Sequence, residues 1–176
     1  MRWAKLFGTA VLLSGPCCFG QTPAGVATKG APQTDAVYSI VVEAPPGPVT
    51  LASPINITVK VTNISGKEAG WRSESPDTAY RNFRYSLTKD GREVATTFYH
   101  RKITGRQRPD DPLEVASGSS ITSMVPPGES FSFTIDLKKL YLITEPGTYR
   151  LDVSRFDESR ITPLRAKTLT LDIASR

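Results

Sequence analysis

Four cationic side chains lie in one polar segment, where they could contact an acidic partner. Residues 101–119 read RKITGRQRPDDPLEVASGS, and the four cations are Arg101, Lys102, Arg106 and Arg108. Binding residues concentrate on loops that a rigid scaffold carries, so these four are the candidate contacts with a partner. The alternative is a mobile, solvated insertion, because loops of this length are usually either functional or disordered. Asp110 and Asp111 lack the Asp-x-Asp-x-Asp-Gly spacing of a calcium loop, and we expect both to be solvated.

Catalytic chemistry would have to use His100, the only histidine in the chain. It follows Phe98-Tyr99 and precedes the basic segment, and no Gly-x-Ser-x-Gly nucleophile motif occurs anywhere. We therefore interpret His100 as a surface imidazole at the end of a strand. The sequence predicts no catalytic, cofactor-binding or metal-binding residues, and we do not expect an enzyme.

The first twenty residues have the three parts of an export signal. Arg2 and Lys5 form a positive start, an apolar run follows to Leu13, and the small residues Cys18 and Gly20 precede a cleavage point before Gln21. We expect a periplasmic or extracellular protein without a lipid anchor. Both cysteines of the chain leave with this signal, so the exported domain has no disulfide. No other segment is apolar for long enough to cross a membrane.

Charge and composition restrict the partner. Loss of Arg2 and Lys5 lowers the formal net charge from +5 to +3. No stripe of Lys and Arg interleaved with aromatic residues is present, so we do not expect a nucleic-acid partner. Residues 21–35, QTPAGVATKGAPQTD, have no periodicity and are predicted to be a flexible leader. The folded domain is expected over 36–176.

Alternation of apolar and polar residues predicts strands throughout that domain. The clearest run, INITVKVTN, puts Ile55, Ile57, Val59 and Val61 on one face. Similar runs cover VYSIVVE at 37–43, FRYSL at 83–87, SITSMV at 120–125 and TLTLDIA at 168–174. Asp90-Gly91 predicts a tight hairpin, with REVATTFYH at 92–100 as its return strand. Trp71 is expected either in the core, which we favour, or exposed as a binding anchor.

Two alternating runs in residues 126–153 are separated by a stretch without period two. FSFTIDL points Phe131, Phe133, Ile135 and Leu137 inward, and TYRLDV points Tyr149, Leu151 and Val153 inward. Between them LKKLYLITEPG has the spacing of one helical turn, so we predict a short helical crossover near 137–143 between two facing sheets. Seven to nine short strands with turns between them predict an antiparallel β-sandwich.

The segment Glu145-Pro-Gly-Thr-Tyr149-Arg-Leu151 resembles the tyrosine corner of immunoglobulin-like domains. That resemblance implies an immunoglobulin-like sandwich in which the Tyr149 hydroxyl bonds to the backbone upstream. Leu151 stands where antibody domains keep a cysteine, which implies a disulfide-free variant. The order FRYSLTKDGREV, PPGESFSFTIDL and EPGTYRLDV is similar in layout to the BsuPI family of bacterial proteinase inhibitors, over residues 37–174.

Two functions are consistent with these observations. We expect a non-catalytic binding module of the cell envelope or the exterior, which recognises a protein or an envelope component. The resemblance to the BsuPI family implies the alternative, a proteinase inhibitor, although the inhibitor that gave the family its name is intracellular and no inhibitory motif occurs in this loop. Fold does not decide between them, and the sequence leaves the partner and the oligomeric state open.

Overall fold

The computed structural model describes residues 36–75, 78–114, 118–155 and 163–176. The chain divides into two units, Met1–Gln33 and Thr34–Arg176, and every described element belongs to the second unit. The predicted export signal at 1–20 and leader at 21–35 lie outside the described residues and stay predictions. None of the helices in the described ranges is long and apolar enough to cross a membrane.

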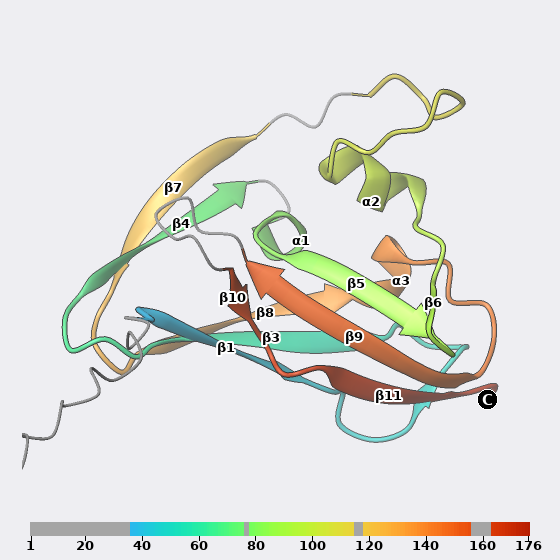
Figure 1. Cartoon of the computed structure of the whole chain (residues 1–176), viewed down its shortest axis with the longest axis horizontal. Helices are drawn as coiled ribbons and strands as arrows, with labels where there is room; N and C mark the ends of the chain where they lie inside the picture. The colour runs from blue at the N-terminus through green and yellow to red at the C-terminus, as the bar shows by residue number, and fades with distance from the viewer. Residues whose placement is uncertain (1–35, 76–77, 115–117, 156–162) are drawn as a thin grey trace, which may run out of the picture. The chain divides into compact units, whose positions relative to one another are not determined.

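Strands dominate the described part of the chain (Figure 1). They are β1 Tyr38–Glu43, β2 Val49–Thr50, β3 Asn56–Asn63, β4 Ala69–Ser75, β5 Arg84–Lys89, β6 Arg92–Glu93, β7 Ser119–Val125, β8 Ser130–Asp136, β9 Gly147–Arg155, β10 Leu164–Arg165 and β11 Leu169–Ala174. The helices are α1 Thr78–Arg81, α2 Phe98–Ile103 and α3 Leu137–Leu140. β2, β6 and β10 have only two residues each. The other eight strands of the described ranges agree with the seven to nine that the sequence predicts.

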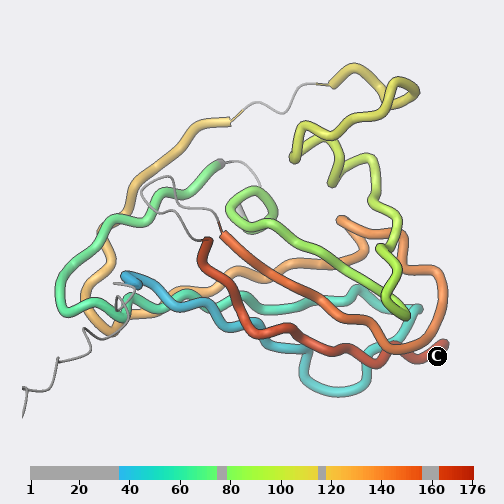
Figure 2. Tube along the Cα trace, viewed as in Figure 1, coloured from blue at the N-terminus to red at the C-terminus, as the bar shows by residue number. Residues whose placement is uncertain are grey.

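The strands form two main sheets, which confirms the predicted all-β sandwich. One sheet has the order β1-β3-β8, and the other has the order β2-β11-β9-β5-β6 with β10 paired to β9. All pairs are antiparallel except β2 with β11. At one edge β1 contacts β10, so the first and last described segments run close together (Figure 2).

The core lies between the inward rows of these two sheets. The innermost residues are Ile57, Val59 and Val61 on β3, and Tyr149, Leu151 and Val153 on β9. Successive side chains of a strand point to opposite faces, so the alternating sequence buries one row and exposes the other, as predicted. On β8, an edge strand of its sheet, Ile135 is fully buried, whereas Phe131 and Phe133 are half-buried.

β4 and β7 pair with each other and form a separate two-stranded ribbon. The ribbon continues the β3–β8 pair, and buried Asn63 holds the junction. Its amide nitrogen donates to the carbonyls of Lys67 at 2.9 Å and Val125 at 2.7 Å, and its side-chain oxygen accepts from Ser65 N at 2.9 Å. Trp71 of β4 is 3% exposed, which confirms its predicted place in the core.

The predicted crossover is present as α3, which connects β8 of one sheet to the other sheet. Asp136 caps α3 by accepting from Lys138 N at 3.0 Å, and Leu137 and Leu140 are fully buried. After α3 the Tyr149 hydroxyl donates to the Glu145 carbonyl at 2.6 Å. This is the bond from tyrosine to upstream backbone that the corner motif predicts.

The predicted return strand over 92–100 is wrong beyond Glu93. The hairpin turn itself is confirmed, because Asp90 and Gly91 have positive φ of 50° and 75°. β6 ends at Glu93, however, and the chain enters α2 at Phe98. Thr97 caps this helix, since its hydroxyl accepts from His100 N at 3.2 Å. The cap and the packing of α2 on α3 outweigh the β propensity of this run.

Candidate functional site

Helix α2 is fixed to the sandwich through its N-terminal cap. The Thr97 hydroxyl donates to the Lys139 carbonyl at 2.5 Å, and Thr97 N donates to the Leu140 carbonyl at 2.9 Å. Tyr99 and Ile103, four residues apart, pack against the core, and they lie on one side of a helix. These contacts position His100 and Arg101, which lie between them in the sequence.

Residues 104–114 follow α2 and are called the basic loop below. An ion pair between Arg101 and Asp111 ties this loop back to the helix. Arg101 Nε donates to Asp111 Oδ2 at 2.7 Å, and Arg101 Nη2 donates to Asp111 Oδ1. Arg108 N also donates to Asp111 Oδ2, at 2.8 Å. Gln107 Nε2 donates to the Pro112 and Glu114 carbonyls at 3.0 and 2.9 Å, so the loop is bonded at several points.

Asp111 is a structural residue of this loop, and the expectation that it is solvated is wrong. Its side chain is 6% exposed. The hydrogen bond from Arg101 is the main reason that the pKa of Asp111 is lowered to about 2, and the backbone N–H of Arg108 acts in the same direction. Asp111 therefore carries its charge at every pH near neutrality.

Two of the four candidate cations are paired with acidic residues of the basic loop. Arg101 is paired with Asp111 and also donates to the Thr96 carbonyl at 2.7 Å. Lys102 forms an ion pair of 2.6 Å with Glu114. Arg106 and Arg108 are exposed, and neither guanidinium has an ion pair with a residue in the described ranges. The structure thus leaves two of the four charges available to a partner.

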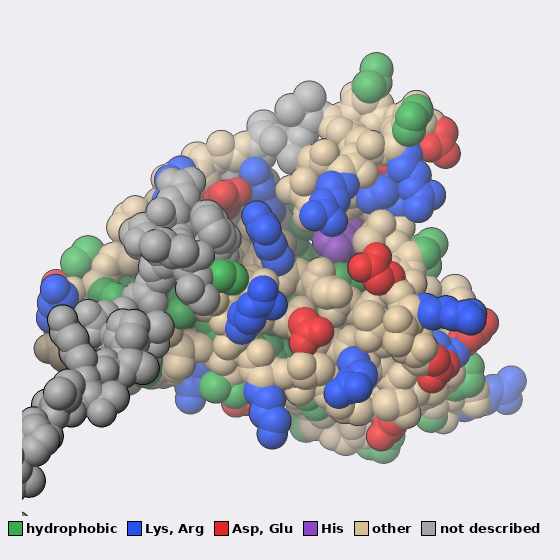
Figure 3. Space-filling model, viewed as in Figure 1, with side chains coloured by type: hydrophobic (Ala, Val, Ile, Leu, Met, Phe, Trp, Pro, Cys, Tyr) green, Lys and Arg blue, Asp and Glu red, His purple; other side chains and the backbone are tan. Residues whose placement is uncertain are grey.

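A cavity of about 480 Å³, called the α2 cleft below, lies between α2, the start of the basic loop and β5. Buried aromatic side chains line its inside, among them Phe83, Tyr85 and Tyr141. Exposed charged residues also line it: Arg84, Glu93 and Arg106. In Figure 3 the histidine, in purple, marks the cleft, and Lys and Arg side chains in blue flank it.

His100 lines the α2 cleft and is 8% exposed, so the expected surface imidazole at a strand end is wrong on both points. Its ring packs edge-on against Tyr141, with 5.1 Å between centroids. Burial lowers the pKa of His100 below its ordinary value, the Arg106 charge adds to this, and the Leu140 carbonyl opposes it. His100 Nδ1 is buried and has no hydrogen-bond partner among the described residues.

Tyr85 and Tyr141 of the cleft are neutral at ordinary pH. Burial raises the pKa of Tyr85 and of Tyr141 well above the usual range of tyrosine. The Tyr85 hydroxyl donates to the Ala79 carbonyl at 2.6 Å. Charge in the cleft therefore comes from its arginines and Glu93. Arg81, another lining residue, is paired with Glu74 at 3.2 Å.

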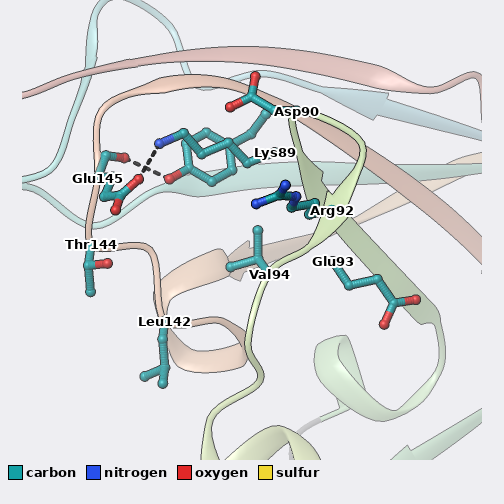
Figure 4. A pocket seen from close by; sticks show the side chains of 9 residues that line it. Lys89, Asp90, Arg92, Glu93, Val94, Leu142, Thr144 and Glu145 are labelled. Carbon is teal, nitrogen blue, oxygen red and sulfur yellow. Dashed lines mark hydrogen bonds and ion pairs between the residues drawn. The ribbon is translucent and has the colours of Figure 1, made fainter.

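A second cavity, of about 350 Å³, lies at the end of the sandwich near the β5–β6 hairpin (Figure 4). Two of its charged groups bind each other, since Lys89 Nζ donates to Glu145 Oε2 at 2.6 Å. This contact raises the pKa of Lys89 and lowers the pKa of Glu145. Lys89 also lies 5.8 Å from the centre of the Tyr149 ring. The cavity lies beside the tyrosine corner, and the Lys89–Glu145 pair joins β5 to the segment that enters this corner.

A third cavity, of about 410 Å³, lies between the β4–β7 ribbon and β8. Trp71, Phe131 and Met124 line it, and the Trp71 and Phe131 rings meet edge to face at 5.0 Å. The Arg155 guanidinium lies 3.7 Å from the centre of the Trp71 ring. β7 contains no charged residue, and Ile121 and Met124 on it are 62% and 57% exposed. Ser73, Ser123 and Glu129 also line this groove, so its walls are both polar and apolar.

No protein-family model matches the chain, and no curated protein matches it at a significant level. Within the described ranges, no group of three or more His, Cys, Asp or Glu side chains is placed to hold a metal ion. Function is therefore inferred from the α2 cleft and the basic loop themselves.

The sequence indicated the basic loop but missed the cleft beneath it. Arg84 lies on β5, Glu93 on β6 and Tyr141 directly after α3, and no spacing rule connects them. One signal was present for α2: Thr97 is a favoured N-cap residue, and Tyr99 and Ile103 have helical spacing. Read as a helix, 98–103 places His100 and Arg101 on the turn that carries the loop.

Proposed function

We propose that this protein is a non-catalytic binding module, an exported immunoglobulin-like sandwich that recognises a protein or an envelope component. The recognition face comprises α2, the basic loop and the α2 cleft. One observation carries the proposal: the Arg101–Asp111 ion pair holds the loop beside a formed cavity while Arg106 and Arg108 stay exposed. A loop that is already ordered loses less conformational entropy when it binds.

Two further observations support this proposal. The scaffold below the face is a sandwich with a continuous core, and rigid scaffolds that carry binding loops are a common arrangement. The bond from Tyr149 to Glu145 has the geometry of a tyrosine corner, which supports the immunoglobulin-like class. Export, and a location in the periplasm or outside the cell, follow from the signal at 1–20 and belong to the same proposal.

One observation favours the alternative, a proteinase inhibitor of the BsuPI type. Residues 105–110 are all exposed, and the hydrogen bonds that Asp111 accepts from Arg101 and from the Arg108 backbone hold this segment in place. An exposed segment held in one conformation is suited to occupy a protease cleft, because little ordering is needed on binding. Inhibition of this kind is stoichiometric and leaves the loop as the contact.

The experiment that tests both is a capture assay with a loop variant. The purified protein is immobilised, exposed to extracellular and envelope extracts, and the retained proteins are identified. The variant replaces residues 105–110 with Gly and Ser and keeps Arg101 and Asp111. Retention of one partner by the wild type but not by the variant is expected. A retained active protease favours inhibition, and equal retention by both proteins contradicts the proposed face.

A further inference from the structure

We propose that the α2 cleft binds the carboxylate of an acidic residue from a partner protein, between Arg106 and His100. This inference rests on the proposed binding function and names the chemistry that the cleft selects. It requires a cation that faces the cavity, a buried hydrogen-bonding group inside it, and walls that accept the rest of the acidic segment.

Arg106 supplies the cation. It lines the cleft, whereas Arg108, two residues further along the same loop, does not. Arg106, His100 and Tyr141 line the same cavity. Burial dominates the pKa of both His100 and Tyr141, and the charge of Arg106 is a smaller effect that acts toward a lower pKa at each. No ion pair to Arg106 occurs among residues 36–75, 78–114, 118–155 and 163–176. A guanidinium offers a carboxylate two parallel hydrogen bonds.

His100 supplies the buried group. Its side chain lines the cleft, and Nδ1 has no partner among the described residues. Buried polar atoms in folded proteins are almost always hydrogen-bonded, and an orphan atom calls for an explanation. A carboxylate seated in the cleft provides the missing partner, because a protonated imidazole donates from both ring nitrogens.

The walls fit an acidic residue with an apolar or aromatic neighbour. Tyr80, Phe83, Tyr85 and Tyr141 are the aromatic residues that line the cavity. The charged residues that line it are Arg81, Arg84, Arg106 and Glu93. Arg81 is paired with Glu74, so Arg106 is the cation that this inference assigns to a bound anion. Arginine at such a site favours an anion, and flat aromatic walls accept an apolar side chain.

Binding of a carboxylate is coupled to a proton on His100. The titratable and charged groups that share the cleft with His100 are Tyr80, Arg81, Arg84, Tyr85, Glu93, Arg106 and Tyr141. In the free protein burial and Arg106 favour the neutral imidazole. A bound carboxylate favours the charged imidazole. Binding therefore takes up a proton, and affinity rises as the pH falls through the histidine range.

The test is a titration of the ¹⁵N-labelled protein with acetyl-Phe-Glu, followed by NMR, with acetyl-Phe-Gln as the neutral counterpart. We expect saturable shifts at His100 and at the amides of α2 with the glutamate peptide alone. Arg106→Gln weakens this binding about tenfold or more, as loss of a charge-assisted bond does. Arg108→Gln removes the same charge from the same loop without touching the cleft, and it weakens binding less than about twofold.

Three results would overturn the inference. They are equal NMR shifts with both peptides, equal losses of affinity in Arg106→Gln and Arg108→Gln, and equal competition by inorganic phosphate. The last result would assign the site to anions in general. The pH readout is separate: between about pH 5.5 and 8 the wild-type affinity falls, by about tenfold for each pKa unit of coupling. His100→Gln, checked for folding by circular dichroism, shows a flat profile, and a profile like that of the wild type contradicts the role of His100.

Failure of this inference and failure of the proposed function give different results. A captured partner that the glutamate peptide does not displace leaves the binding face intact and removes the carboxylate site. A peptide that binds as described, together with a capture experiment that retains nothing, keeps the site and removes the support for a protein partner.

Discussion

Thr97 is the residue on which the placement of α2 depends most directly. Its hydroxyl accepts from His100 N at 3.2 Å and donates to the Lys139 carbonyl at 2.5 Å. Loss of an N-cap hydroxyl costs about 0.5–2 kcal/mol, and a single net hydrogen bond contributes about 0.5–1.5 kcal/mol. The hydrogen bond to the Lys139 carbonyl is exposed to solvent, so it adds little to the loss of the cap. We therefore expect the free energy of unfolding to fall by about 1–2 kcal/mol in Thr97→Ala.

Thr97→Ser is the matched control, because it keeps the hydroxyl and loses only a methyl group. With a urea dependence of about 2 kcal/mol per molar, the midpoint of Thr97→Ala falls by roughly 0.5–1 M and that of Thr97→Ser by less than half as much. Hydrogen exchange at the His100 amide, which loses its acceptor, should accelerate in Thr97→Ala alone. An unchanged midpoint together with unchanged exchange at this amide would refute the anchoring role of Thr97.

Three other predictions concern the core, the basic loop and the β4–β7 ribbon. Ile57→Ala empties a fully buried position of β3 and should lower the free energy of unfolding by about 2–5 kcal/mol. Lys60→Ala, on the exposed face of the same strand, should change the free energy of unfolding by less than about 0.5 kcal/mol. Equal urea midpoints for the two variants would contradict the strand register. The lowered pKa of Asp111 means that its contribution to stability is complete above the ordinary carboxylate pKa and is lost as the pH falls from there toward about 2. Urea midpoints measured across that range should therefore fall less in Asp111→Asn than in the wild type. Parallel plots of urea midpoint against pH for the two proteins would exclude the Arg101–Asp111 ion pair as the cause of the acid destabilisation. Ser120→Lys places a cation opposite Glu74 on the uncharged edge strand β7. Charged edges resist strand-to-strand association, so turbidity on heating should decrease, and unchanged or increased turbidity would show that this edge is not the site of association.

The sandwich could be predicted from the sequence because its signals are local. Ile57, Val59 and Val61 alternate with polar residues, and a strand with one buried face requires this pattern. The crossover at 137–143 was predicted because Leu137 and Leu140 have helical spacing between two runs of period two. Each of these patterns is complete within about ten residues, which is the span that periodicity can report.

The errors lie where distant contacts decide the outcome. Thr96, Thr97, Phe98 and Tyr99 have high strand propensity, yet α2 forms there because Thr97 bonds to Lys139, far away in the sequence. Propensity is a weak indication that tertiary contacts override. The predicted strand also placed His100 on the surface, so its burial could not be foreseen.

The candidate site was predicted only in part, for the same reason. The sequence presents Arg101, Lys102, Arg106 and Arg108 as four equivalent cations. Asp111 makes these cations different from one another. It pairs with Arg101, ten residues away, and so sets the path of the loop between residues 101 and 111. That path brings Arg106 to the cleft and leaves Arg108 outside it, which spacing alone does not determine.

The central claim, recognition through α2 and the basic loop, is tested most directly by hydrogen exchange of the protein with and without its captured partner. We predict slower exchange over residues 97–111 in the complex, with β7 and the exposed face of β3 unchanged. Protection confined to β7 or to the β5–β6 hairpin, with residues 97–111 exchanging as in the free protein, would contradict the claim.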